Sequence, residues 1–583
     1  MLTRSLSDGN NVACQSSRTK VSNHPAITRP HQPSASSRLL QIPPSKTTTY
    51  RSCPHHTKPL PQHHGSYWSP VISEIDYPFE PLGTRSLISK ARLSRLILFL
   101  LQLSLTISHI TLTVQHKHLE DLANLYFVVF YSSAFLTTVF SPVISARISK
   151  SFIVVSGIIS AFLAASTLFI PQMGILLAIS VINGSCWGLV MVKPGLSALN
   201  LGLQYACIKD LKDRKGTAAD WYLWSQVALH NGALLGSMIF AGTKKLLTLP
   251  QATLQPTLKM PCGRSACGTS DSKIKMPPFG SARSFASLNQ TLRPERPSLI
   301  DDGHANGILA VIAACWALTA LAVLGLTYCC SPSRRKKRRQ RYDGNSSGGG
   351  GNHLRDDQSS LSLDGSQAST QVFHETAISQ LRQIADLLLY DHKLQTVLPL
   401  VLFTGMQSAF IFNTFTKDFV LCALGEEHAG WTLATHSSAY ALTLLAVYRL
   451  SLHTKRLYIL CWTVVFQVGI GVVLLWWRAG NRDLPMFLIV TTVFGVAEGG
   501  FVALLTGLLV RLFCHAWTNV LPIMLAFRFL GYAIGVSASL LLCITAQIYF
   551  MYTVLGLALI PFGILEWKYS VFLHKKHLLE AFV

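Results

Sequence analysis

The stretch Cys329-Cys-Ser-Pro-Ser-Arg-Arg-Lys-Lys-Arg-Arg-Gln-Arg341 decides how the rest of the chain is arranged. It directly follows an apolar run, 308–328, that is long enough to cross a membrane. A dense block of positive charge at the end of a membrane helix stays on the cytoplasmic side, where anionic lipids attract it. We therefore orient every other segment from this block, and count six apolar spans before it and six after it.

The composition is that of a membrane protein. Half of the 583 residues are apolar and only 13% are charged, which excludes an ordinary soluble domain. The net charge of +23 comes mainly from basic residues in the tails and between the apolar spans. Membrane topology already explains basic residues in those places, so nucleic acid is not predicted as a partner.

Twelve apolar stretches match the length of about 20 residues that crosses the hydrocarbon core. In the first half they cover 93–114, 125–146, 152–170, 174–196 (extending at most to 205), 219–242 and 308–328. In the second half they cover 397–424, 431–448, 457–477, 484–510, 520–544 and 548–567. The predicted fold is an all-α polytopic membrane protein of 6+6 transmembrane helices, in two pseudo-symmetric halves at 93–330 and 396–570.

The segments outside the spans differ in composition. Residues 1–92 are rich in Ser, Pro, His and Thr, contain no recognisable secretory signal, and are predicted to be a disordered cytoplasmic tail. The first span would then act as the insertion signal. Residues 571–583 are predicted to be a cytoplasmic C-terminal tail. Short loops on the cytoplasmic side carry most of the loop Lys and Arg, which supports this orientation.

The two halves are joined by a predicted cytoplasmic linker, 331–395. Its first part is rich in Gly and Ser and is predicted to be flexible. Towards its end, apolar residues recur at helical spacing: Ile378, Leu381, Ile384, Ala385 and Leu388. This pattern predicts an amphipathic helix on the membrane surface before the seventh span.

The loop 243–306 is predicted to be extracytoplasmic. It contains Asn289-Gln-Thr291, an acceptor sequence for N-glycosylation. It also contains Cys262 and Cys267 on either side of a Gly-containing turn, in an oxidising compartment. We predict a local disulfide between these two residues, and expect the cysteines within apolar runs to act as small hydrophobic residues.

The basic block has chemistry of its own. Cys329 and Cys330 are juxtamembrane and cytoplasmic, so they are candidates for palmitoylation, with buried thiols as the alternative. The residues that follow are predicted to contact anionic lipids, with a further role in trafficking: Arg334, Arg335, Lys336, Lys337, Arg338 and Arg339.

No catalytic constellation is recognisable in the sequence. A phosphate loop, an HExxH zinc pair and a GxSxG elbow are all missing, which argues against an enzyme. The group of Cys53, His55, His56, His63 and His64 fits no metal-finger spacing. We predict no cofactor and no metal.

The informative residues are charges at membrane depth, because each costs about 2.5 to 3.5 kcal/mol on insertion scales unless it is paired. Glu498 and Arg528 are predicted about 18 and 12 Å from the cytoplasmic side, at 1.5 Å per helical residue. Their long side chains could therefore meet. The pair is either functional, as a proton or cation relay or a substrate site in the bundle interior, or a structural ion pair that sets helix register, and the structural reading is favoured.

Three further charges lie within predicted spans. Lys193 precedes Pro194 in the fourth span, and a functional and a structural role are equally consistent with it. Lys417 and Asp418 lie in the outer half of the seventh span, where side chains reach the membrane surface by snorkelling.

The arrangement of twelve spans around a central cytoplasmic loop resembles the major facilitator superfamily. Within it, several stretches resemble the uncoordinated-93 family of ion-channel regulators and receptor-trafficking proteins, and the likeness covers about 93–570. The stretches are Ser141-Pro-Val-Ile-Ser-Ala-Arg147, Gly184 to Lys193, the cysteine pair of the glycosylated loop, Thr416-Lys-Asp-Phe-Val-Leu-Cys-Ala-Leu-Gly425, Gly495-Val-Ala-Glu498 and Arg528-Phe-Leu-Gly531.

The sequence departs from that family in two places. Asn413 and Thr414 stand in the region where the family commonly has an acidic residue, and Glu498 stands where it usually has Asp.

The resemblance implies a non-enzymatic accessory protein that binds another membrane protein. A potassium channel regulated at the plasma membrane is the favoured partner, and trafficking of Toll-like receptors from endomembranes is the alternative. A secondary transporter of a small solute is the other alternative; the loop after the second span lacks the Gly and Asp of the superfamily's gating motif, which favours the accessory role. Oligomeric state is left open.

Overall fold

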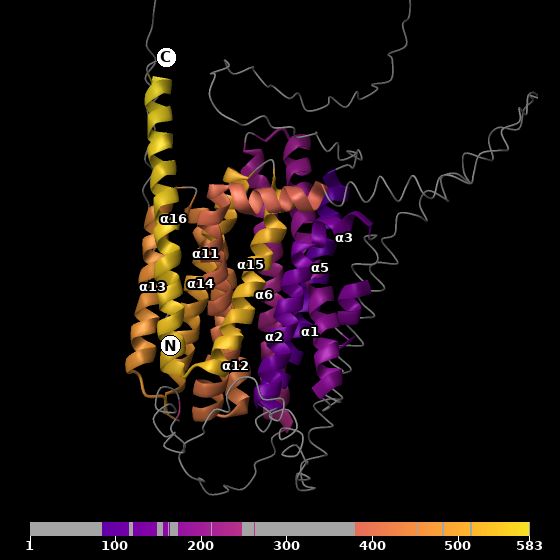
Figure 1. The fold of residues 1–583 in the computed structure, drawn as a ribbon, viewed down its shortest axis with the longest axis vertical. Coiled ribbons are helices and arrows are strands. Elements are labelled where there is room, and N and C mark those ends of the chain that lie inside the picture. The colour runs from indigo at the N-terminus through magenta and orange to yellow at the C-terminus, as the bar shows by residue number, and fades with distance from the viewer. Residues whose placement is uncertain are drawn as a thin grey trace, which may run out of the picture. The chain divides into compact units, whose positions relative to one another are not determined.

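The structure is a computed structural model that describes residues 84–115, 120–147, 155–160, 162–163, 173–211, 213–247, 262, 379–451, 453–480, 483–513 and 516–581. Long helices account for most of them (Figure 1). In the first half these are α1 (Thr84–Gln115), α2 (Glu120–Val139), α3 (Ser141–Arg147), α5 (Met173–Ile208) and α6 (Arg214–Leu247). In the second half they are α11 (His392–Ala409), the π-helix η2 (Phe410–Leu421), α12 (Glu426–Leu450), α13 (Arg456–Trp476), α14 (Leu484–Leu512), α15 (Trp517–Leu541) and α16 (Ile544–Ala581).

Eight of the helices in the described ranges are long and apolar enough to cross a membrane. They are Thr84–Val114, Leu122–Val139, Met173–Ile208, His392–Leu421, Arg456–Trp476, Leu484–Leu512, Trp517–Leu541 and Ile544–Lys568. The prediction of an all-α polytopic membrane protein is confirmed. The fourth span is one continuous helix that runs beyond 196 and contains Pro194.

The predicted count of twelve is only partly reproduced. Helices α6 and α12 coincide with the predicted fifth and eighth spans, but they are not among the eight apolar ones. Their sequences carry more polar residues, and the two helices pack against each other between the halves. Most of the third predicted span and all of the sixth lie outside the described residues, so the 6+6 arrangement stays a prediction.

Among the described helices, two pairs make the most extensive contacts between the predicted halves. Helix α2 packs on α15, and α6 packs on α12. Helices α2 and α6 are the predicted second and fifth spans of the first half, and α12 and α15 are the second and fifth spans of the second half. In each contact, therefore, a second span of one half packs on the fifth span of the other. This reciprocal pairing is the pattern expected of two similar halves that face each other.

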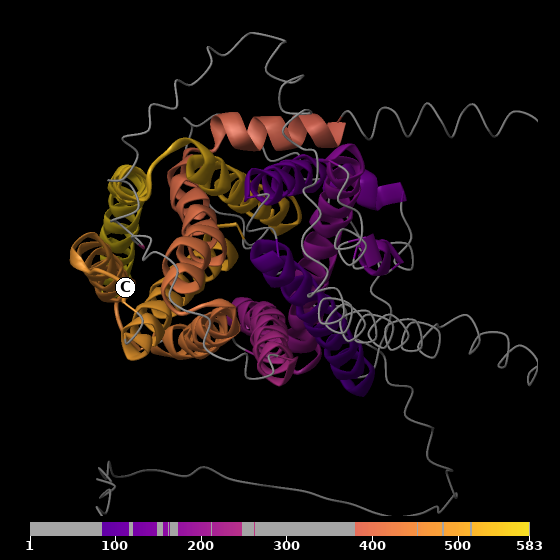
Figure 2. The same cartoon turned by 90° about the horizontal axis from the view of Figure 1, so that it is seen from below.

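A short helix at 379–390 precedes α11 and crosses the ends of α11 and α15 (Figures 1 and 2). Ile384 is buried on the helix bundle, and Leu387 and Leu388 pack beside it. Ala385, predicted on the same face, is exposed. Asp391 lies between this helix and α11. It is the N-cap of α11, because its side chain accepts hydrogen bonds from the backbone N–H groups of Lys393 and Leu394.

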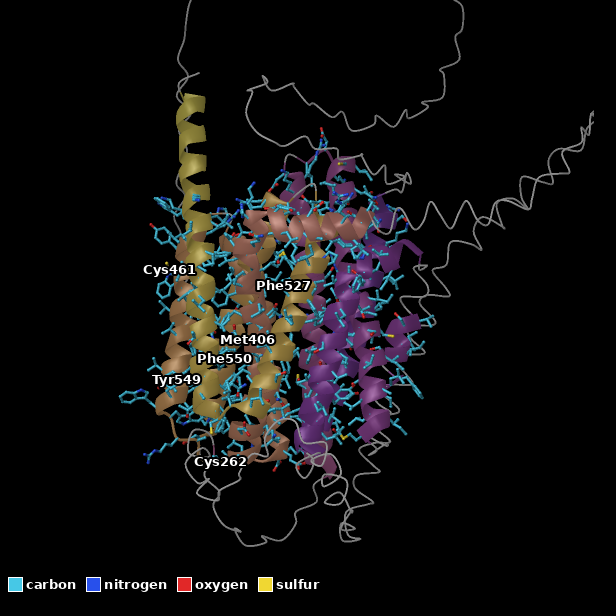
Figure 3. The ribbon with its side chains drawn as sticks, viewed as in Figure 1. Cys262, Met406, Cys461, Phe527, Tyr549 and Phe550 are labelled. Carbon is cyan, nitrogen blue, oxygen red and sulfur yellow. A yellow bond between two sulfur atoms is a disulfide. The ribbon has the colours of Figure 1, made fainter. Side chains whose placement is uncertain are left out.

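Helices α13 and α16 are the least buried spans. The apolar windows of α13 and α16 are only 39% and 28% buried by protein. Apolar side chains point away from the bundle, as Figure 3 shows for Cys461 on α13 and Tyr549 on α16. Such faces match what lipid chains cover in a membrane.

The disulfide prediction was wrong in its partner. Cys262 is bonded to Cys422, which follows the last residue of η2, and the two Cα atoms are 5.6 Å apart. The prediction relied on closeness in sequence, whereas the fold brings together two cysteines that are 160 residues apart. Cys262 lies at the end of the bundle opposite the helix 379–390 (Figure 3).

Several predicted sites lie outside the described residues. They are Cys267, the glycosylation site Asn289, the cysteines Cys329 and Cys330, and the basic residues Arg334, Arg335, Lys336, Lys337, Arg338 and Arg339.

Candidate functional site

A buried ion pair lies in the interior of the second half. Glu498 on α14 is 1% exposed, and its Oε1 lies 2.7 Å from Nη2 of Arg528 on α15. The side chain of Arg528 is 16% exposed. The two residues therefore meet, as their depths in the predicted spans indicated.

Two more side chains contact the carboxylate. Ser408 on α11 donates a hydrogen bond to Glu498 Oε1. His436 on α12 places Nε2 3.3 Å from Glu498 Oε2, close but not aligned for a hydrogen bond. Glu498 is thus contacted from three neighbouring helices. A charge in a low-dielectric interior needs this degree of compensation, because an unpaired one is strongly destabilising.

Glycines explain why these helices come close enough. A Cβ on Gly495 of α14 would collide with the carbonyl of His436 on α12. A Cβ on Gly531 of α15 would collide with the carbonyl of Leu402 on α11, and Gly405 of α11 meets the carbonyl of Arg528 in the same way. Gly495 and Gly531 are each three residues from a member of the ion pair. Close helix packing and charge pairing are therefore encoded together.

A cavity of about 110 Å³ adjoins the ion pair. Arg528 connects the two, because it both binds Glu498 and lines the cavity. The walls come from both halves: α1, α2, α5 and α6 on one side, and α11, η2 and α15 on the other. The polar lining residues are Gln102, Thr106, His109, Thr113, His230, Asn413 and Arg528, and the aromatic ones are Phe127, Tyr131, Trp187, Phe412, Phe529 and Tyr532.

Ring contacts across the halves hold the cavity in shape. Tyr131 on α2 stacks on Tyr532 of α15 with ring centroids 4.5 Å apart. His230 on α6 stacks on Tyr440 of α12 at 3.5 Å. Aromatic pairs of this kind contribute stability beyond the area that they bury. Three residues of the cavity wall, Tyr131, Tyr532 and His230, are therefore in ring contacts between the halves.

The remaining predicted charges do not join the site. Lys193, Lys417 and Asp418 are half-buried and do not line the cavity. Near Lys193 on the same helix, Gly184 of α5 lets α2 approach closely, since a Cβ there would collide with the carbonyl of Phe130.

Sequence reasoning missed several residues of the site. Ser408 and the histidines His109, His230 and His436 were not singled out. The signal for the histidines was present, because each is a titratable residue inside a predicted membrane span. Ser408 carries no such signal. In the part of the chain that the structure describes, no group of three or more His, Cys, Asp or Glu residues could hold a metal ion.

The helices and the site define a multi-pass α-helical membrane protein with a compensated charge pair beside an internal cavity. Over about a third of its length the chain is similar to unc-93 proteins. It is 25% identical over 181 residues to "Protein unc-93 homolog A" of Danio rerio, which is 31% of this chain and 39% of that protein. The corresponding human protein is 26% identical over 30% of this chain and 38% of its own length.

A third relative is "Putative potassium channel regulatory protein unc-93" of Caenorhabditis elegans, 28% identical over 28% of this chain and 23% of that protein. These matches confirm the predicted resemblance. They span well under half of the relatives' length. No protein-family model matches the chain.

Three solved transporters are similar in outline. The nucleoside transporter NupG is 12% identical, with 82% of this chain and 99% of that chain covered and a TM-score of 0.41. The fucose:proton symporter FucP of E. coli is 13% identical (83% and 98% covered, TM-score 0.45), and the xylose transporter XylE of E. coli is 13% identical (83% and 97% covered, TM-score 0.43). Likeness at these TM-scores carries no weight for the fold or the function.

Proposed function

We propose that this chain is a non-enzymatic accessory protein of the plasma membrane that regulates or traffics a partner membrane protein, with a potassium channel as the partner. The similarity to the unc-93 proteins carries the proposal, because one of them bears the name of a potassium channel regulatory protein. Both termini are placed in the cytoplasm, as the distribution of loop charges predicts. The two halves have a major-facilitator-like arrangement in this proposal.

The charge pair supports a structural role over ion coupling. A residue that carries a proton or cation through a cycle must exchange its partner, whereas Glu498 is held by Arg528 and Ser408 at once. A closed network of this kind sets the register of α11, α14 and α15. Helices held in register present a constant outer surface, which is what a binding partner needs.

The test is co-expression of the full chain with a two-pore potassium channel in cells that lack both. We expect the whole-cell potassium current to change relative to the channel alone, at equal total channel protein. An unrelated multi-pass protein expressed to the same level is the control. An unchanged current, together with no channel recovered when the full chain is purified from native membranes, would contradict the proposal.

The cavity favours a second candidate, a secondary transporter of a small solute. It is lined from both halves, as a site between rocking halves would be. Purified protein in liposomes separates the two functions. Accumulation of a solute that is lost in Glu498→Gln would replace the accessory role with transport.

A further inference from the structure

We propose that the cavity beside Arg528 is a binding site for a small organic carboxylate with a compact apolar body. The proposal does not depend on which membrane protein is the partner, since it concerns the interior of the bundle.

The charge of the cavity wall favours an anion. Arg528 lines the cavity, and no Asp or Glu is among its lining residues. Glu498 binds Arg528 through Nη2 and is not itself part of the wall. The Nε atom of Arg528 is buried and has no hydrogen-bond partner among the described residues. A carboxylate that reaches this side chain would form a charge-assisted hydrogen bond, the stronger kind.

Two histidines belong to the same wall, and each has a ring nitrogen that is buried. His230 on α6 is only 9% exposed, and its Nε2 has no hydrogen-bond partner within the described ranges. The same holds for the buried Nε2 of His109 on α1. A buried polar atom left without a partner costs about 1–3 kcal/mol. A ligand with acceptor oxygens would remove that cost once the imidazole ring turns a protonated nitrogen towards the cavity.

The remaining residues of the wall are mainly apolar and aromatic, and they limit the size and polarity of the part of the ligand beyond its carboxylate. Rings surround the polar atoms, among them Phe127, Trp187 and Phe529. The volume of about 110 Å³ is of the same order as the roughly 150 Å³ engineered cavity that binds benzene. One ring or a short branched chain therefore fits. Aromatic walls also attract cations, but the guanidinium of Arg528 repels them here.

Such a ligand would contact both halves at once. Arg528 belongs to α15 in the second half, and His109 and His230 belong to α1 and α6 in the first. Binding would therefore stabilise the conformation in which these helices surround the cavity, at the expense of any other.

Benzoate is the probe, used with the full chain in lipid nanodiscs, and empty nanodiscs correct for partition into lipid. Benzamide and benzylamine have the same ring with a neutral and a cationic group. We expect benzoate to bind at least about tenfold more tightly than benzamide in calorimetry, because one charge-assisted hydrogen bond exceeds a neutral one by about that factor. Equal binding of benzamide or benzylamine would overturn the proposal.

Matched variants locate the site. Thr113 lines the cavity, and Thr553 lies on the exposed face of α16; each hydroxyl bonds the carbonyl four residues earlier. Thr113→Phe should abolish benzoate binding and Thr553→Phe should not. Benzoate binding that survives in Thr113→Phe would show that the site is elsewhere.

A second variant keeps the test valid if Thr113→Phe does not fold. His230→Phe keeps an aromatic ring at the position that stacks on Tyr440, and replaces the imidazole by a slightly larger ring without nitrogen atoms. We expect it to weaken benzoate about tenfold while leaving benzamide nearly unchanged. An equal loss for both compounds would mean that His230 only shapes the cavity, and would overturn its assigned role.

Discussion

The helix pairs α2–α5 and α12–α14 are packed alike but carry different polar groups. On α5, Gly184 and Gly188 meet the carbonyls of Phe130 and Ala134 of α2. On α14, Gly495 and Gly499 meet the carbonyls of His436 and Tyr440 of α12. Both pairs thus use two glycines four residues apart, the spacing by which membrane helices approach closely.

The residue that precedes a glycine differs between the pairs. Asn183 precedes Gly184 and donates a hydrogen bond of 2.8 Å to the hydroxyl of Tyr126 on α2; Ser160 donates to its side-chain oxygen. Glu498 precedes Gly499 and forms an ion pair. Since a neutral network suffices in α2–α5, close packing does not by itself require the charge in α12–α14. The charge of Glu498 instead pairs with Arg528, which lines the cavity.

The largest effect is expected when the charged pair is broken on one side. Arg528→Met leaves Glu498 buried without its cation, which should cost about 3–5 kcal/mol of stability. Reversible unfolding of the purified protein in lipid or detergent measures this. The double variant Glu498→Gln with Arg528→Met removes both charges and should recover most of the loss. A double variant as unstable as Arg528→Met alone would contradict the pairing.

A loss of stability smaller than that of Arg528→Met is expected at the packing glycines, and it should be similar in the two helix pairs. Gly184→Leu and Gly495→Leu each insert a side chain where a backbone carbonyl now lies, which should cost about 1–3 kcal/mol. Gly556→Leu, in open space on α16, is the control and should cost little. Unfolding of the three variants under one condition tests this, and a large difference between positions 184 and 495 would show that the two pairs do not pack alike.

The smallest effect is expected in the neutral network. Asn183→Leu removes the bond to Tyr126 without leaving a charge, and hydrogen bonds between membrane helices are worth about 0.6 kcal/mol on average and 1.7 at most. The same unfolding measurement should therefore rank it far below Arg528→Met. A comparable loss in both would remove the distinction between the two pairs.

Residue spacing predicted part of this arrangement. Glu498 and Arg528 could be expected to meet because depth along a helix follows from counting residues at 1.5 Å each. Which other helices surround Glu498 does not follow from such counting, so Ser408 and His436 were missed. The pairing of Cys262 with Cys422 depends on how loops and helix ends assemble, which spacing within one loop does not reveal. Helices α6 and α12 were located correctly, although protein rather than lipid covers much of their surface.

The bond between Cys262 and Cys422 closes a ring in the covalent chain. The ring includes the whole linker 331–395 and the start of the second half. A single protease cut anywhere inside it opens the ring without separating the two pieces, which stay joined through sulfur until a reductant is added. A chain cut in the linker would therefore run on a non-reducing gel as one species. The two halves are thus connected twice, once by peptide bonds and once by the disulfide.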